Sequence, residues 1–144
     1  TYFDDTTFSL RGKNFYITHG DGVLSWDYGY RILKKIIRSP FFIWCFRLLH
    51  PTLAYKIARK VSRTENHPEL PEEVREKIRN ELKNYALTHF QKGFDYMVCG
   101  HYHLNEIIDV EKGKLAVLGD WQDDPSYAVF DGKELTLHQW ENNA

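Results

Sequence analysis

The sequence predicts a single α/β domain built in layers. Short strand-like runs rich in aromatic and β-branched residues stand near the start of the chain and again after residue 93. Between them lie a helical stretch and one long amphipathic helix. This order favours helices packed on a sheet over a helical bundle or a barrel. With 144 residues, 42% of them hydrophobic, the chain is long enough for one core and too short for two.

The first strands are expected at the beginning of the chain. The stretch RGKNFYITHGDG predicts a hairpin turn at Gly12-Lys13 and a strand over residues 14–18. A loop with two glycines follows that strand. His19 is therefore expected at the carboxyl end of a strand.

A helical insert is expected over about residues 28–66. Apolar residues recur there at helical spacing. Breaks at Ser39-Pro40 and His50-Pro51 divide the insert into three helices, because proline removes a backbone donor and opens a new helix more readily than it continues one.

The clearest helix signal covers residues 71–93. Pro71 stands at a first-turn position, Glu72 and Glu73 follow it, and Gly93 comes just past the end. The apolar positions that follow helical spacing are Val74, Ile78, Leu82, Tyr85 and Phe90.

The tail predicts four strands arranged as a β-meander. The runs FDYMVCG, KLAVLGDW, SYAVFDG and KELTLHQW alternate with glycine, aspartate and proline signals. Asp131-Gly132 marks a tight hairpin between the last two runs.

Composition narrows the function class. The 19 basic and 20 acidic residues give a net charge of -1, so the balance offers no reason to expect a nucleic-acid partner. Cys45 and Cys99 have neither paired spacing nor the density of a disulfide scaffold, which fits a reducing cytoplasm. The longest apolar run, FFIWCFRLL, is about half the length that crosses a bilayer. It remains long enough to touch a membrane surface.

Three histidines form the candidate site. His19 follows one predicted strand, and His101 and His103 follow another, directly behind Gly100. Ligands collect at the carboxyl ends of strands in layered α/β folds, and imidazole is the commonest nitrogen ligand for metals. We therefore expect one metal cleft. For Asp21, orienting a metal-bound histidine or water and capping its own loop are equally compatible with the sequence.

Other polar residues near or outside these motifs are assigned structural roles. Asp120 is expected to be structural. The remaining histidines lack useful partner spacing and are expected at the surface or as capping groups: His50, His67, His89 and His138.

The motifs ITHGDG and VCGHYH, each behind a strand, resemble the last two motifs of the calcineurin-like metallophosphoesterases. Within that superfamily, HGDGVLSWDYGYR, the helical insert and VLGDW at 117–121 are similar to the UDP-2,3-diacylglucosamine pyrophosphatases of lipid A synthesis. The resemblance implies the C-terminal part of a layered metallophosphoesterase sandwich. The family's earlier motifs, with their bridging aspartate, are not in these residues, so we expect the chain to be part of a longer protein and inactive or weakly active alone.

The same resemblance implies the ligands and the cofactors. His19 and His101 would hold one divalent ion and His103 a second, both expected to be Mn²⁺. Asp21 is the candidate catalytic carboxylate, and Asp27 and Tyr30 would lie near the substrate head group.

The insert is strongly basic. No acid stands between Asp27 and Glu65, whereas a solvated helical face usually mixes signs. Apolar residues interleave with the cations, which favours an anionic, lipid-like neighbour; equally, they could pack the insert onto the domain, with acids of the next helix balancing its charge. The cations are Arg31, Lys34, Lys35, Arg38, Arg47, Lys56, Arg59, Lys60 and Arg63. Four of them are the candidate substrate-binding cations: Arg31, Lys56, Arg59 and Lys60.

The implied activity is metal-dependent hydrolysis of the pyrophosphate of UDP-2,3-diacylglucosamine to UMP and a lipid 1-phosphate. It implies a cytoplasmic protein, peripheral on the inner membrane of a bacterium, with an anionic membrane surface as one partner. The missing N-terminal half or a second copy of the chain is expected as a further partner, because it would cover exposed strand edges. Two alternatives stay open: a metallophosphoesterase acting on a soluble phosphoester, and a non-catalytic module that binds lipid surfaces.

Overall fold

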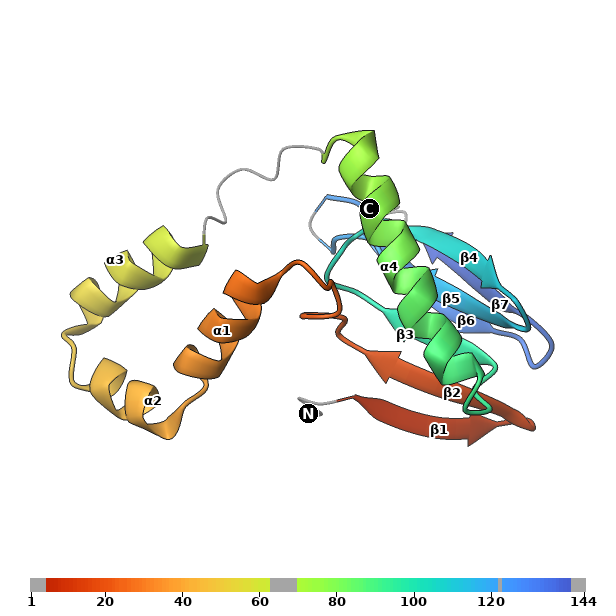
Figure 1. Cartoon of the computed structure of the whole chain (residues 1–144), viewed down its shortest axis with the longest axis horizontal. Helices are drawn as coiled ribbons and strands as arrows, with labels where there is room; N and C mark the ends of the chain where they lie inside the picture. The colour runs from red at the N-terminus through yellow and green to blue at the C-terminus, as the bar shows by residue number, and fades with distance from the viewer. Residues whose placement is uncertain (1–4, 63–69, 122, 141–144) are drawn as a thin grey trace. The chain divides into compact units, whose positions relative to one another are not determined.

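The computed structural model describes residues 5–62, 70–121 and 123–140, without the side chains of residues 30 and 60–62 (Figure 1). The chain divides into two compact units. Residues 1–24 and 72–144 form the first, which we call the sheet unit, and residues 25–71 form the second, which we call the insert.

A five-stranded mixed sheet organises the sheet unit and confirms the α/β class. Its order is β1-β2-β3-β5-β4. The central neighbours β2, β3 and β5 are parallel, whereas β1 and β4 pair antiparallel at the two edges. The strands are β1 (Thr6–Leu10), β2 (Lys13–Thr18), β3 (Tyr96–Cys99), β4 (Glu106–Val110) and β5 (Gly113–Val117).

The hairpin between β1 and β2 turns at Arg11 and Gly12, one residue earlier than the sequence predicts. Arg11 has φ 50° and Gly12 has φ 78°, so both adopt the left-handed conformation that a two-residue hairpin with right-handed twist requires. Glycine reaches this conformation without strain, which is why the glycine signal located the turn so closely.

Helix α4 (Glu72–Phe90) covers one face of the sheet (Figure 1). Its buried residues Ile78, Leu82 and Ala86 pack with sheet residues such as Met97 and Leu115. Gly93 follows the helix with φ 96°, the left-handed position that often ends a helix. The amphipathic pattern of this helix is therefore confirmed as the source of the main core.

His89 corrects an expectation. We expected it at the surface or as a capping group, and the surface position is wrong because His89 is buried in α4. Its ring stacks on Tyr16 with centroids 4.0 Å apart, and its Nδ1 lies 3.0 Å from the carbonyl oxygen of Tyr85. Burial is tolerated because the polar ring nitrogen has a partner.

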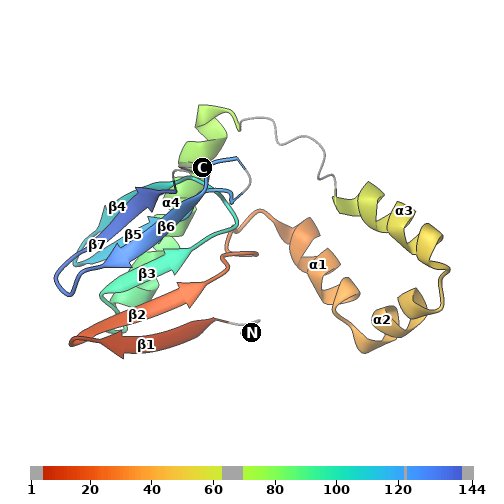
Figure 2. The same cartoon turned by 180° about the vertical axis from the view of Figure 1, so that it is seen from behind.

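The opposite face carries a separate two-stranded sheet of β6 (Ser126–Phe130) and β7 (Leu135–Gln139), as Figure 2 shows. The Asp131 carboxylate accepts the amides of Lys133 and Glu134 at 2.7 and 2.8 Å, which closes the predicted hairpin. Leu135 packs with Phe15, and with sheet residues on the same side.

The predicted four-strand meander is wrong. β3 and β5 belong to the parallel centre of the large sheet, and β6 and β7 form their own sheet. The sequence reading also missed β4, which pairs with β5 through residues 106–110. Hairpin signals are local, whereas parallel pairing joins strands distant in sequence, so turn residues alone could not reveal it.

The insert contains three helices, as the sequence predicts: α1 (Tyr28–Ile37), α2 (Pro40–Arg47) and α3 (Pro51–Ser62). The Ser39 hydroxyl accepts the Phe42 amide at 3.2 Å and caps α2, with Pro40 in the first turn. Within the fully described helix α2 no residue is buried.

Candidate functional site

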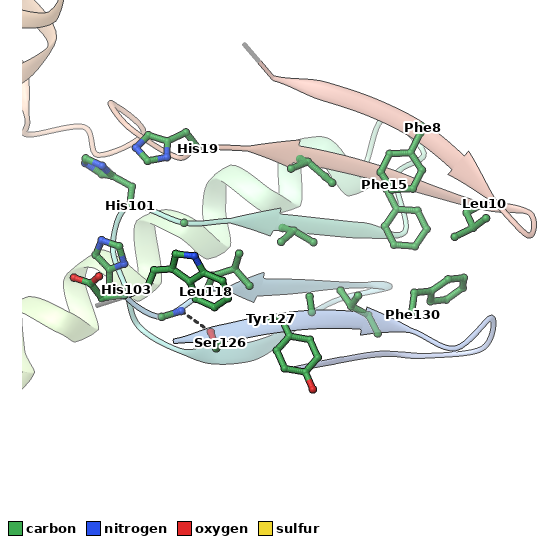
Figure 3. A pocket seen from close by; sticks show the side chains of 18 residues that line it. Phe8, Leu10, Phe15, His19, His101, His103, Leu118, Ser126, Tyr127 and Phe130 are labelled. Atoms are coloured by element: carbon green, nitrogen blue, oxygen red, sulfur yellow. Dashed lines mark hydrogen bonds between the residues drawn. The ribbon is translucent and has the colours of Figure 1, made fainter. Parts of the chain in front are cut away.

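The histidines lie where two parallel strands end side by side. β2 and β3 are neighbours, and Thr18 pairs with Cys99 in the ladder. His19 follows β2 directly, and His101 lies in the loop after β3. The two imidazoles face each other with ring centroids 5.1 Å apart at an interplanar angle of 69° (Figure 3). The expectation that these residues meet is therefore confirmed for this pair.

Tight backbone contacts hold the two loops together. Gly20 has φ 92°, and a side chain there would meet the Cys99 Cβ and the Gly100 carbonyl oxygen at 3.5 Å. The Gly20 amide donates to the Thr18 hydroxyl at 3.1 Å. Glycine suits this position because the backbone is left-handed, whereas neighbours at 3.5 Å would leave room for a side-chain carbon.

The loop after β3 has an unusual backbone. His101 has φ 62° and His103 has φ 51°, both in the left-handed region. Such conformations are costly for side chains larger than glycine and cluster at functional sites. Here they turn His101 and His103 into one groove that His19 also lines (Figure 3).

The groove has a volume of about 680 Å³ and two unlike ends. The three histidines lie at one end, and Phe8, Leu10 and Phe130 lie at the other (Figure 3). Phe8 and Phe15 stack with centroids 4.9 Å apart and form part of the apolar wall. Polar groups beside an apolar wall are typical of sites for small organic ligands.

The histidine pair fits a shared metal ion. An imidazole nitrogen lies about 2.1 Å from a bound ion and its ring centre about 3.3 Å from it, so two such rings at ordinary ligand angles have centres about 4.6 to 5.4 Å apart. The observed 5.1 Å falls in this range. Within the part of the chain that the structure describes, however, no three His, Cys, Asp or Glu side chains form a group that could hold a metal. Any metal ion shared by this pair would need further ligands from elsewhere.

The two candidate aspartates of the sheet unit differ in position. Asp120 follows β5 and lines the same groove as the histidines, close to the cleft as its sequence position predicts, and its structural role stays a prediction. Asp21 is half-buried in the loop after His19 and is not among the residues that line the groove. Its catalytic role stays a prediction.

The remaining candidates belong to the insert. The Asp27 carbonyl oxygen accepts the Arg31 amide at 3.1 Å at the start of α1. The Arg31 guanidinium lies 5.9 Å from the Tyr28 ring centre, and the Lys56 and Arg59 side chains are exposed. The side chains of Tyr30 and Lys60 lie outside the described residues, as does His67.

Sequence reasoning missed the apolar wall of the groove. Phe8 pairs with Phe15 across the β1–β2 hairpin, and Ile17 continues the same face. The apolar residues at 15 and 17 alternate as expected for one face of a strand, so they could have predicted that this face is apolar. The part of the face that is left uncovered depends on how far β6 extends over it.

Two features of the described helices bear on membrane contact. Among the described residues, no helix combines the length and apolar character needed to span a bilayer. The described part of the insert nevertheless exposes large apolar side chains, among them Phe41 at 75% and Trp44 at 59%.

Comparison with known proteins gives weak but consistent similarities, although no family model matches the chain. UDP-2,3-diacylglucosamine hydrolases of two Pseudomonas putida strains are each 32% identical over 56 residues, which is 39% of this chain and 23% of theirs. The UDP-2,3-diacylglucosamine hydrolase of Porphyromonas gingivalis is 29% identical over 154 aligned positions, covering 94% of this chain and 58% of the relative. The chain thus spans less than two thirds of the length of each of these relatives.

Proposed function

We propose that this chain forms part of a metal-dependent hydrolase that cleaves the pyrophosphate of UDP-2,3-diacylglucosamine into UMP and a lipid 1-phosphate. The observation that carries the proposal is the meeting of His19 and His101 at 5.1 Å in a groove that His103 also lines. The names of the three similar proteins supply the substrate.

The residues of the chain would divide the work as follows. His19 and His101 would hold one ion as neutral nitrogen ligands, and His103 would contribute to a second. Bound divalent ions, for which we propose Mn²⁺, supply an activated water and neutralise charge on the phosphate oxygens. Asp21 orients one of the histidines or the attacking water through a hydrogen bond. Water attacks one phosphorus, and the bridging P–O bond breaks to release UMP.

The site needs carboxylates beyond the described residues. Two-metal hydrolases keep their ions about 3.5–4 Å apart, and a carboxylate shared by both ions is a suitable bridge. We propose that a further polypeptide segment, from the parent protein or from a second copy, supplies it. The exposed Phe8 and Leu10, at the other end of the groove from the histidines, give such a segment an apolar surface to cover.

The insert is the proposed contact with lipid. Its cations attract anionic groups, and its exposed Phe41 and Trp44 reach the apolar side of a headgroup region. Asp27, Tyr30, Arg31, Lys56, Arg59 and Lys60 remain the proposed substrate contacts. Localisation on the cytoplasmic side of a bacterial inner membrane is part of the same proposal.

The exposed apolar residues of the insert also favour a second candidate function, a non-catalytic module that binds lipid surfaces. The two functions differ in what they need from the histidines. Vesicle binding by a pure module is unaffected by His101→Ala or by EDTA, whereas UMP release by the hydrolase requires both the histidine and the metal.

The hydrolase is tested by UMP release from UDP-2,3-diacylglucosamine. The assay compares the longest natural polypeptide that contains these residues with the 144-residue chain, each with Mn²⁺ and after EDTA. We expect metal-dependent release from the first and little from the second. Absence of UMP release by the longer polypeptide with Mn²⁺, Co²⁺, Mg²⁺ and Zn²⁺ alike would overturn the proposal.

The lipid contact is tested by binding to phosphatidylglycerol vesicles. Each of Arg31→Gln and Lys35→Gln should weaken binding about fivefold at low salt, because a cation near an anionic surface contributes about 1 kcal/mol. Lys92→Gln, at an exposed position in the turn after α4, is the matched control and should change binding little. Equal effects of all three substitutions would show that vesicle binding depends on the net charge of the chain and not on the insert.

A further inference from the structure

Trp121 is the most exposed of the four tryptophans. Its side chain is 69% exposed, against 47%, 59% and 57% for Trp26, Trp44 and Trp140. It is also the only one of the four that lines the groove with the histidines. An indole left open at a polar end of a groove presents a flat apolar surface to whatever enters there.

The loop that carries Trp121 is fixed at both ends. The Gly119 amide donates to the Ser126 hydroxyl at 2.7 Å, and the Asp124 amide donates to the Asp120 carbonyl oxygen at 2.9 Å. A side chain at Gly119 would lie 2.1 Å from the Asp124 carbonyl oxygen, so the backbone segments at the two ends of the loop are in direct contact.

A second set of bonds ties the same loop to its surroundings. The Asp124 carboxylate accepts the Asn105 amide group at 2.6 Å and the Gln139 amide group at 2.9 Å. Asn105 lies in the stretch after His103, so the tryptophan loop is anchored to the chain that carries two of the histidines. An anchored backbone reduces the conformational entropy that this loop loses when a ligand stacks on the tryptophan.

Other aromatic rings of the groove are engaged by neighbours. Phe15 stacks on Phe8 and meets Phe130 edge-on at 5.1 Å. Tyr127 stacks on His138 with centroids 5.6 Å apart, and its side chain points away from the histidines (Figure 3). Trp121 follows β5, whose carboxyl end lies beside that of β3, so its exposed indole is the groove surface best suited to stack on a planar ring near the histidines.

We propose that Trp121 is a specificity residue that stacks on the uracil ring of the nucleotide. This inference rests on the proposed function, which places the phosphates at the histidines. Stacking recognises any planar base, so Trp121 adds affinity for the nucleoside end of the substrate and none for the phosphate itself.

The test is the binding of UMP and of ribose 5-phosphate to the full chain with Mn²⁺, measured by calorimetry. Trp121→Ala should weaken UMP binding about tenfold, as loss of one base–aromatic stack does, and should leave ribose 5-phosphate binding unchanged. Trp121→Phe should retain most of the UMP affinity because it keeps an aromatic face. Trp140→Ala, an exposed tryptophan outside the groove lining, should change neither affinity.

Three results would overturn the inference: equal loss of both affinities in Trp121→Ala, unchanged UMP affinity in that variant, or no UMP binding by the unaltered chain. Unchanged UMP affinity together with an altered oligomeric state would assign Trp121 to a protein interface instead. The outcome is separable from the hydrolysis assay. Base-dependent binding without any UMP release would overturn the proposed reaction and leave the stacking role intact.

Discussion

The two faces of the five-stranded sheet differ in how completely they are covered. On the α4 side, Leu82, Met97 and Leu115 have no solvent exposure. On the other side, β6 and β7 cover part of the sheet, and Phe8 and Leu10 remain 43% and 45% exposed beside the groove. Stability therefore depends mainly on one face, and the candidate chemistry belongs to the edge of the other.

The largest loss of stability is expected from a substitution on the α4 side of the sheet. Leu82→Ala should lower the free energy of unfolding by about 3 kcal/mol, because it leaves a cavity in a packed core. Phe8→Ala, on the open face, should cost about 1 kcal/mol or less, since much of that ring is already in water. Urea denaturation measures both. Equal losses would show that the groove face is as well packed as the α4 face.

Two glycines, one on each side of the sheet, have different close neighbours. A side chain at Gly113 would meet the Phe90 ring at 2.6 Å on the α4 side, whereas one at Gly119 would meet a backbone carbonyl at 2.1 Å near the groove. Each alanine substitution should cost about 1–3 kcal/mol. Gly119→Ala should cost more, because a ring can rotate away and the pinned carbonyl cannot.

Readouts of local structure separate the two substitutions. Gly119→Ala should also change the fluorescence of Trp121, and Gly113→Ala should leave it unchanged. A smaller stability loss for Gly119→Ala than for Gly113→Ala would show that the tryptophan loop yields easily, which contradicts its role as a fixed platform.

The smallest change in stability is expected at the amino ends of β2 and β3, at the opposite edge of the sheet from the histidines. Burial opposes ionisation of Asp95, but the Asn14 amide at 2.8 Å and the Lys13 ammonium at 2.9 Å outweigh it and lower the pKa of the carboxyl. A lowered pKa stabilises the fold above the unfolded-state pKa and loses that contribution as the pH falls. Asp95→Asn should cost about 1 kcal/mol at neutral pH, and this cost should shrink as the pH falls through the lowered pKa of the Asp95 carboxyl.

Thermal unfolding at several pH values checks this prediction. A cost that stays constant down to acid pH would assign the effect to lost hydrogen-bond geometry rather than to the ionised carboxylate. Metal binding at the other end of the strands should be unaffected at neutral pH, since the histidines lie at the carboxyl ends.

The position of the site could be predicted from sequence because its signals are local. A strand followed by histidine and glycine places His19 at a strand end, and Gly100 does the same for His101. That the two meet depends on β2 and β3 being parallel neighbours, which only the assembled sheet shows. The left-handed backbone of His101 and His103 could not be predicted either, because histidine adopts this conformation only at a minority of positions and no local motif marks these two.

Other features escaped prediction for the same reason. β4 has Glu106 and Asp109 in a short strand, and both find partners only after folding: Arg79 at 2.8 Å and Lys114 at 3.5 Å. Burial of His89 depends on Tyr16 from a strand more than seventy residues away. Patterns along the chain predict element type well, but they do not predict which distant element satisfies a polar group.

The proposal that His19 and His101 share a metal ion is tested by Mn²⁺ binding to the chain. Titration followed by electron paramagnetic resonance should show at least about tenfold weaker binding in His19→Ala and in His101→Ala, since even the loss of a residue that only orients a metal ligand costs that much. His138→Ala, an exposed histidine bonded to Thr136, should bind Mn²⁺ as the unaltered chain does. Equal binding by all four proteins, with circular dichroism confirming that each is folded, would contradict the claim.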